Sequence, residues 1–318
     1  TQHPTQPFPP RLSRIRSVNS KIHPTHTSIN LLAQIVSNKR KTIDNRRQSQ
    51  HENSVTVGLL GLKLEILNFY ALAALVTAPV FGSFLGVLVK RLPAGESFIS
   101  SRSRCPSCHK QLSIRDLIPI VSWVAVKGRC RHCEGKISVF YPAIESLALA
   151  IAIWTTIVVP DWLIWPTCAL GWTLLALSFI DSQDFILPDQ LTLPLIVLGL
   201  GTAYFLAPER FGLHITGVGV GFALFKTVGI IYRRIRQREG LGGGDAKLIA
   251  ASGAWVSLSG LPSVILVASL VALAWTVLTK RSSIPPPPLT AIPFGPFIAL
   301  ATWLVWLYGP LKLSLPLY

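Results

Sequence analysis

Runs of about twenty mostly apolar residues recur along this chain and constrain its fold more than any other feature. A helix needs about 20 such residues to cross the hydrocarbon core of a bilayer. Half of the residues are hydrophobic and 14% are charged, whereas ordinary soluble domains carry ~25% charged residues. We therefore predict an all-α polytopic membrane protein. Soluble, collagen-like, coiled-coil and disulfide-scaffold folds are excluded.

About eight segments are predicted to cross the membrane, and short turn-forming stretches separate them. They are 67–89, 142–159, 162–180, 191–207, 211–232, 246–259, 261–279 and 291–308. The chain then divides into a disordered basic tail at 1–65 and a first transmembrane helix at 66–90. A cytosolic loop domain at 91–141 follows, and a transmembrane core of about seven helices occupies 142–310.

The formal net charge of +16 indicates membrane orientation, not nucleic-acid binding, because the charges flank apolar segments. Basic residues between the spans gather at 90–141, 233–238 and 280–281. Alternating spans place these three loops on one side, which the positive-inside rule makes cytosolic. The basic tail would lie on the opposite side and does not fit this orientation. We expect the lipid bilayer, and no nucleic acid, as a partner.

Four cysteines in the predicted cytosolic loop form two C-x-x-C pairs, Cys105/Cys108 and Cys130/Cys133. Their spacing is close to that of zinc ribbons, and four thiolates complete the tetrahedral shell of Zn²⁺. Such a shell has no open position for a catalytic water, so we predict a structural zinc in a small zinc-ribbon-like domain. Two disulfides or a redox motif are the alternatives. A cytosolic loop disfavours stable disulfides, and a redox motif needs only one pair. We expect His109 and His132 to be exposed loop residues.

Three acidic residues, Asp181, Asp184 and Asp189, follow the span 162–180 without a basic neighbour. Ionisable groups at membrane depth are costly, and they are functional candidates by default. Asp181 directly follows the apolar run and is the one we expect to be desolvated. We expect Asp184 to be solvated and Asp189, after Pro188, to cap the next helix.

A second acidic position, Asp245, opens the span 246–259 after a glycine-rich stretch that includes Gly242 and Gly244. Glycines let the backbone bend sharply or approach another chain closely. Lys247 follows, but the stretch does not match the Walker pattern of nucleotide-binding loops. A helix N-cap is the local alternative for Asp245.

Asp181 and Asp245 lie at the cytosolic ends of different spans and can converge at one depth. Two close carboxylates cannot both ionise readily, so they share a proton. The ionised member can then take a proton from water while the protonated member hydrogen-bonds the scissile carbonyl. This pairing predicts aspartyl proteolysis at a membrane surface.

Ordered motifs from about residue 68 to residue 309 resemble those of the prepilin peptidases, also called type IV leader peptidases, which are bacterial GxGD aspartyl proteases. The motifs are Gly82-Ser83-Phe84-Leu85, Lys90-Arg91-Leu92-Pro93, Ser101-Arg102-Ser103-Arg104-Cys105-Pro106, Asp116-Leu117-Ile118-Pro119, Gly128-Arg129-Cys130-Arg131, Tyr141-Pro142-Ala143-Ile144-Glu145, Leu187-Pro188-Asp189, Leu191-Thr192-Leu193-Pro194, Gly242-Gly243-Gly244-Asp245-Ala246-Lys247-Leu248 and Ile292-Pro293-Phe294-Gly295-Pro296.

The resemblance implies a multi-pass enzyme of the bacterial cytoplasmic (inner) membrane with its active site at the cytosolic face. It implies cleavage of the basic leader from type IV prepilins and pseudopilins, just before their hydrophobic helix. Asp181 and Asp245 match the family's catalytic pair, and the four cysteines match its zinc-binding loop. Many members also methylate the new N-terminus, so the resemblance implies S-adenosylmethionine as a cofactor.

Glu145, just inside the second span, is a candidate for the methylation step or for contact with the substrate amine. A structural hydrogen bond to a neighbouring helix is the alternative for this residue. Gly86 stands where the family commonly has Asn, which bears on methylation more than on proteolysis. Leu241 stands where Met is common, a conservative change.

A catalytically inactive scaffold of a pilus, secretion or competence system is the alternative function. The presence of both acids, the glycines and all four cysteines argues against it. A transporter would use acids deep within the spans as a proton relay, whereas the clearest acids here lie at span ends. The sequence predicts neither the particular pilins processed nor the oligomeric state.

Overall fold

The structure of the 318-residue chain is a computed structural model. It describes residues 69–96, 105, 107–108, 110–111, 113, 118–237, 242–282 and 292–311. The chain divides into two compact units, Thr1–Leu64 and Glu65–Tyr318, and every described residue belongs to the second. The predicted tail at 1–65 therefore lies outside the described residues.

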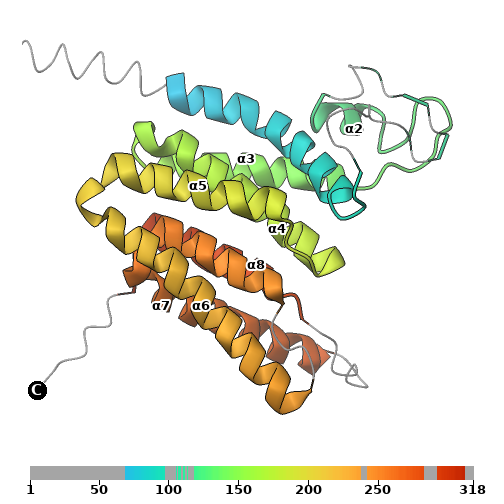
Figure 1. The fold of residues 1–318 in the computed structure, drawn as a ribbon. Helices are drawn as coiled ribbons and strands as arrows, with labels where there is room; N and C mark the ends of the chain where they lie inside the picture. Colours follow the sequence, from blue (N-terminus) through green and yellow to red (C-terminus); the bar gives the residue numbers. More distant parts are fainter. Residues whose placement is uncertain are drawn as a thin grey trace, which may run out of the picture. The chain divides into compact units, whose positions relative to one another are not determined.

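The predicted all-α fold is confirmed, since long helices dominate the described ranges (Figure 1). The helices are Phe69–Arg91 (helix 69–91), α2 at Val121–Ala125, α3 at Phe140–Val158, α4 at Ile164–Asp184, α5 at Asp189–Leu206, α6 at Phe211–Arg236, α7 at Gly243–Ser282 and α8 at Gly295–Tyr308. Short 3₁₀ turns, η2 at Asp161–Leu163 and η3 at Pro208–Arg210, precede α4 and α6.

Six of the described helices are long and apolar enough to cross a membrane, and α8 is shorter, with 14 residues. The predicted segments 246–259 and 261–279 both lie within α7. The number of long helices is therefore smaller than the predicted number of spans, because two predicted spans share one helical element.

A break in α7 lies at Ser257, whose backbone has φ 64° and ψ 176°. A β-carbon added to Gly221 of α6 would lie 3.0 Å from the side chain of Ile249 and 3.3 Å from that of Leu261. In one continuous helix these two residues would be ~18 Å apart along the axis. The chain therefore turns back near Ser257, two residues before the predicted boundary at Ser259.

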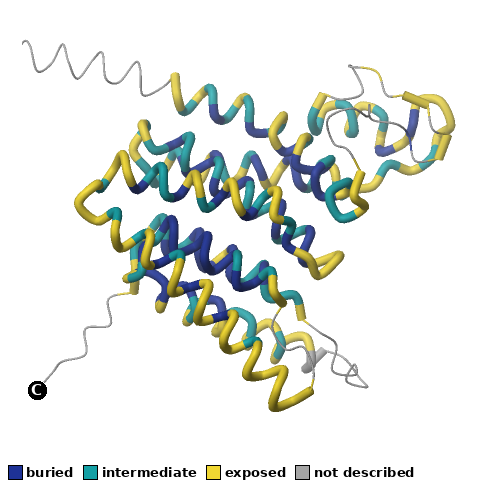
Figure 2. Tube along the Cα trace, viewed as in Figure 1, coloured by how far each residue is buried: buried dark blue, intermediate teal, exposed yellow. Residues whose placement is uncertain are grey.

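The buried core has two parts that share α4. One part joins α4, α5, α7 and α8, and the other joins helix 69–91, α3 and α4. In the apolar stretch of the α4 span 56% of the residues are buried, against 11% in α6. Figure 2 shows this contrast as dark blue in α4 and α8 and yellow along most of α6. The α4 helix is thus the central element, and Asp181 lies near its end.

Helices α6 and α7 approach so closely that their backbones touch. A β-carbon on Gly253 of α7 would lie 2.4 Å from the carbonyl oxygen of Gly217 in α6. Small residues permit such contact between membrane helices. The pairing of Gly217 with Gly253 and of Gly221 with Ile249 also fixes α6 as antiparallel to the part of α7 before Ser257.

Candidate active site and cysteine cluster

Asp181 lies in the last turn of α4 and is 5% exposed. The main-chain N–H of Gly295, the first residue of α8, donates to its Oδ2 at 2.9 Å. The first N–H groups of a helix lack partners within the helix, and the helix dipole favours negative charge there. The packing of α8 against α4 therefore supplies a binding position for this carboxylate.

Asp245 is 7% exposed and is the third residue of α7. Its Oδ2 accepts the main-chain N–H of Gly242 at 3.2 Å. The helix begins at Gly243, so Gly242 holds the N-cap position and the carboxylate reaches back to it, as the acidic member of a capping box does. The N-cap alternative for Asp245 is therefore wrong in detail, since the side chain caps from within the helix.

The structure brings these two aspartates to the same end of the bundle. The charge of Asp181 acts on Asp245 electrostatically. Leu187, in the segment after α4, packs against Gly244, where a β-carbon would lie 2.8 Å from the Leu187 Cβ. The segment that follows Asp181 thus contacts the first turn of α7, next to Asp245.

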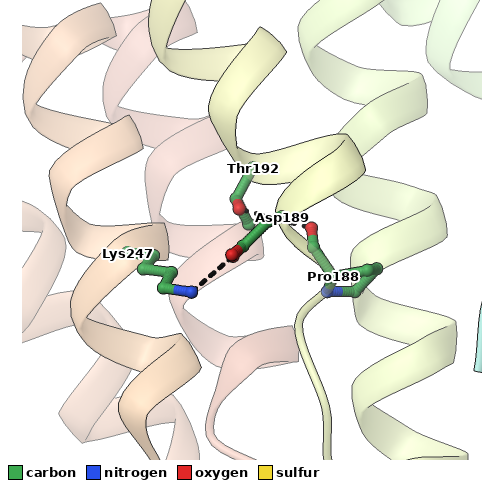
Figure 3. A network of polar contacts seen from close by, with 4 residues as sticks. All are labelled: Pro188, Asp189, Thr192 and Lys247. Carbon is green, nitrogen blue, oxygen red and sulfur yellow. Dashed lines mark hydrogen bonds and ion pairs between the residues drawn. The ribbon is translucent and has the colours of Figure 1, made fainter.

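Asp189 and Lys247 form an ion pair beside this contact (Figure 3). Asp189 is the first residue of α5, and Pro188 takes the N-cap position because its backbone is already extended. The sequence predicted that Asp189 caps α5. This prediction is wrong, because Asp189 binds Lys247 of α7 instead. The only sequence signal for this pair is an acid without a basic neighbour and a lysine two residues after Asp245. Asp184 is exposed, as expected.

Glu145 is 5% exposed in α3, and its Oε2 accepts the main-chain N–H of Ile120 at 2.6 Å. Helix 69–91 also contacts this residue, because a β-carbon on Gly82 would lie 2.6 Å from the Glu145 Cα. Ile120 has φ 60°, which is strained for a β-branched residue. Glu145 therefore connects two helices and the loop before α2. These contacts agree with the structural role that was the alternative for this residue, although the hydrogen bond goes to a loop.

The segment between helix 69–91 and α3, residues 92–139, is called the cysteine loop. The sulfurs of Cys105, Cys108, Cys130 and Cys133 all lie within 4.8 Å of one another, and none is in a disulfide. The Cys105 and Cys133 sulfurs are 3.8 Å apart. A tetrahedral site with Zn–S bonds of about 2.3 Å has S···S edges of ~3.8 Å. The four residues therefore fit a zinc ion in both donor type and geometry.

Hydrogen bonds prepare one of these thiols for metal binding. The main-chain N–H groups of Cys108 and Ser107 stabilise the Cys105 thiolate and lower its pKa from 9.0 to about 6. Hydrogen bonding to Gly135 favours the Cys133 thiolate, but contacts with neighbouring sulfurs, led by that of Cys108, and desolvation outweigh it and raise its pKa to about 12. Cys105 is thus ionised at neutral pH, and thiolates are the form that binds metal.

Three further residues of a metal-binding type are His109, His132 and Cys168. His132 is exposed, and its Nδ1 lies 3.3 Å from Lys110 Nζ. His109 lies outside the described residues. Cys168 is fully buried in α4, far in sequence from the cluster, where it packs as a small apolar side chain.

Two family models match this chain. The bacterial peptidase A24 N-terminal domain matches residues 76–159, which include the cysteine loop. The type IV leader peptidase family matches residues 168–277, which include both aspartates.

Similar proteins cover most of the same region. A prepilin leader peptidase/N-methyltransferase of Aeromonas salmonicida (strain A449) is 34% identical over 258 residues, 72% of this chain and 88% of the relative. A protein of the same name from Stutzerimonas stutzeri is 34% identical over 274 residues, which are 76% of this chain and 91% of the relative. A type 4 prepilin-like proteins leader peptide-processing enzyme of Escherichia coli O78:H11 is 36% identical over 242 residues, which are 70% of this chain and 87% of the relative. No solved structure gives a significant match.

Proposed function

This chain belongs to the type IV leader peptidase family, and from that membership we propose that it removes the leader peptide of type IV prepilins and pseudopilins. We propose Asp181 and Asp245 as the catalytic pair. The observation that carries the assignment is that these two buried carboxylates, 64 positions apart in sequence, lie at one end of the bundle, where Leu187 of the segment after α4 packs on Gly244, the residue before Asp245. Each also accepts a main-chain N–H, from Gly295 and Gly242 respectively.

The proposed chemistry needs only these two side chains and water. The ionised carboxylate takes a proton from a water molecule as the water oxygen attacks the scissile carbonyl carbon. The protonated carboxyl group donates to the carbonyl oxygen and stabilises its developing charge. The tetrahedral intermediate then collapses as its C–N bond breaks, and the carboxyl group that took the proton from water passes it to the departing amine. The hydrogen bonds from Gly295 and Gly242 keep both carboxyl groups oriented during these transfers.

We propose that the catalytic end faces the cytosol, in a bacterial inner membrane. The hydrogen bond from Lys90 to Gln183 places the end of helix 69–91 beside the end of α4. The antiparallel packing of α6 on α7 brings the basic end of α6, with Arg233, Arg234 and Arg236, to the same end. Positive charge at this end supports a cytosolic orientation. The substrate would present its leader there and its hydrophobic helix to the bilayer.

We also propose methylation of the new N-terminus with S-adenosylmethionine, on the basis of family membership alone, and no described residue is assigned to that cofactor. The four cysteines would hold a structural zinc ion, which contributes order to the cysteine loop and takes no part in proteolysis.

The test is cleavage of a co-expressed prepilin in membranes, followed by mass spectrometry. We expect wild type and the control Asp184→Asn to cleave, and both Asp181→Asn and Asp245→Asn to leave the prepilin intact. Zinc content and yield should be equal in all four proteins. A product one methyl group heavier than the cleaved chain supports the second activity. Cleavage by either catalytic-site variant would refute the pair, and no cleavage by wild type on several prepilins would favour the inactive scaffold.

A further inference from the structure

Residues 185–189, which lead from α4 into the start of α5, are attached to the beginning of α7 at two points, one on each side of Asp245. Leu187, 8% exposed, packs on Gly244, the residue before Asp245. Asp189 binds Lys247, two residues after Asp245 (Figure 3). The first attachment is apolar and buried, and the second is ionic and lies at the surface.

Asp181 lies at the other end of this attached segment. The α4 helix ends at Asp184, and Phe185 adopts a left-handed backbone with φ 55°, which turns the chain toward α5. The position of Asp181 relative to Asp245 therefore depends on how residues 185–189 are attached to α7.

This ion pair contributes little to the stability of the fold. The Lys247 and Asp189 side chains are 37% and 51% exposed. Exposed pairs contribute little to folding stability, and salt screens them. A small shift of reacting groups can, however, reduce the rate about a hundredfold, because the chemical step depends steeply on geometry.

We propose that Asp189 and Lys247 are positioning residues, and that their ion pair sets the arrangement of Asp181 and Asp245 for the chemical step. The inference rests on the proposed function. It assigns no contact with substrate to either residue, so both act through the aspartates. A matched control is Asp184, another exposed carboxylate on the same stretch of chain.

The experiment compares wild type with Asp189→Asn, Lys247→Gln, Lys247→Arg, the exchange variant Asp189→Lys/Lys247→Asp and the control Asp184→Asn. Purified full-length proteins cleave a prepilin peptide in detergent, and kcat and KM are measured. We expect each charge-removing variant to lose about tenfold in kcat with an unchanged KM. The exchange variant and Lys247→Arg should recover most of kcat, and Asp184→Asn should match wild type. Melting temperatures within a few degrees of wild type would exclude unfolding as the cause.

A second readout uses salt. Raising ionic strength at saturating peptide should lower kcat of wild type and leave kcat of Lys247→Gln unchanged, since the pair is already absent in that variant. Unaltered kcat in both charge-removing variants, a change confined to KM, or failure of the exchange to recover activity would each overturn the inference while the proposed function stands. A wild type that cleaves no prepilin would refute the proposed function, and the inference with it.

Discussion

The aspartate end of the bundle and the cysteine loop both join motifs that are far apart in sequence, but they are held together in different ways. Asp181 lies on α4, which has eleven buried residues. The cysteine loop contains α2, in which no residue is buried, and an isolated β-bridge between Arg129 and Lys136. Packing therefore organises the first region, whereas the second has few apolar contacts of its own.

This difference fits the presence of the metal-binding cluster in the cysteine loop. About fifty residues cannot bury enough apolar surface to fold independently with ease, and a structural metal supplies the missing stabilisation. Each aspartate instead accepts one main-chain N–H at the start of a helix, from Gly295 and Gly242 respectively. Changes in packing should affect the aspartates and spare the loop, and removal of metal should do the reverse.

The largest effect on cleavage outside the aspartates themselves is expected for Gly295→Ala. The new methyl group would lie 2.7 Å from the Asp181 Oδ2 and 3.0 Å from its Cγ, so the carboxylate must move and its hydrogen bond is lost. We expect kcat to fall on the order of a hundredfold. Peptide cleavage measures the effect, and circular dichroism and zinc content should be unchanged.

A matched control for this variant is Gly219→Ala on α6. Nothing lies within 4 Å of a β-carbon at that position, so the methyl group meets no neighbour. Its cleavage rate should equal that of wild type. Cleavage by Gly295→Ala at the wild-type rate would mean that the hydrogen bond from Gly295 to Asp181 is not required for catalysis.

Removal of the metal should break the second region and spare the first. We expect Cys130→Ser to lose zinc and to expose the cysteine loop to protease, because folding of such a loop is coupled to metal binding. Melting of the helical bundle should be unchanged, and cleavage should fall less than in Gly295→Ala. Cys168→Ala, which removes a buried thiol from α4, is the control and should retain zinc. A bundle that unfolds on zinc loss would contradict the separation of the two regions.

The order of the metal-free loop should depend on pH between about 6 and 9. Folding lowers the pKa of Cys105 from 9.0 to about 6, so its thiolate stabilises the folded loop fully above pH 9. This contribution declines as the pH falls and is lost below about 6. Cys133, with its pKa raised to about 12, acts in the opposite direction and only above pH 9. Protease protection of the chelator-treated chain should therefore rise from pH 6 to pH 9, and protection that stays flat would refute the assignment.

Local sequence patterns were sufficient for the helical fold and for the cysteine cluster. Apolar runs identify membrane helices, and two C-x-x-C turns each hold two sulfurs close together whatever the rest of the fold does. The turn within α7 was also predicted near its position at Ser257, because small residues there permit a break.

Contacts between distant helix ends were not predictable in the same way. Asp189 and Lys247 are 58 positions apart, and their pairing follows from the packing of α5 on α7. The bond from Ile120 to Glu145 depends equally on where the cysteine loop meets the bundle. The N-cap assignments considered for Asp189 and Asp245 were wrong by one and three positions, because Pro188 and Gly242 occupy the N-caps. The catalytic pairing of Asp181 and Asp245 stays a prediction until cleavage is measured.

A smaller effect than zinc loss is expected at Glu145, where the two regions meet. Glu145→Ala leaves the N–H of Ile120 without its acceptor, which costs on the order of 1 kcal/mol for a partly buried group. Glu145→Gln keeps an acceptor oxygen and should lose less. Denaturant unfolding and protease digestion of the cysteine loop measure the difference. If Glu145→Gln abolished methylation while the loop stayed protected, the carboxylate would have a chemical role beyond attachment.

The smallest effect is expected at Lys90, the exposed contact between helix 69–91 and the catalytic end. Its ammonium group donates to Gln183 Oε1 at 2.8 Å and lies 5.0 Å from the centre of the Phe140 ring. Exposed contacts of these kinds contribute about 0.5–1 kcal/mol, so Lys90→Met should lower the free energy of unfolding by no more than that. Lys90→Arg, which keeps a cation over the ring, should lose less, and both should cleave at close to the wild-type rate. Loss of cleavage in Lys90→Met without loss of stability would mean that helix 69–91 takes part in catalysis, and that the two regions are not separable.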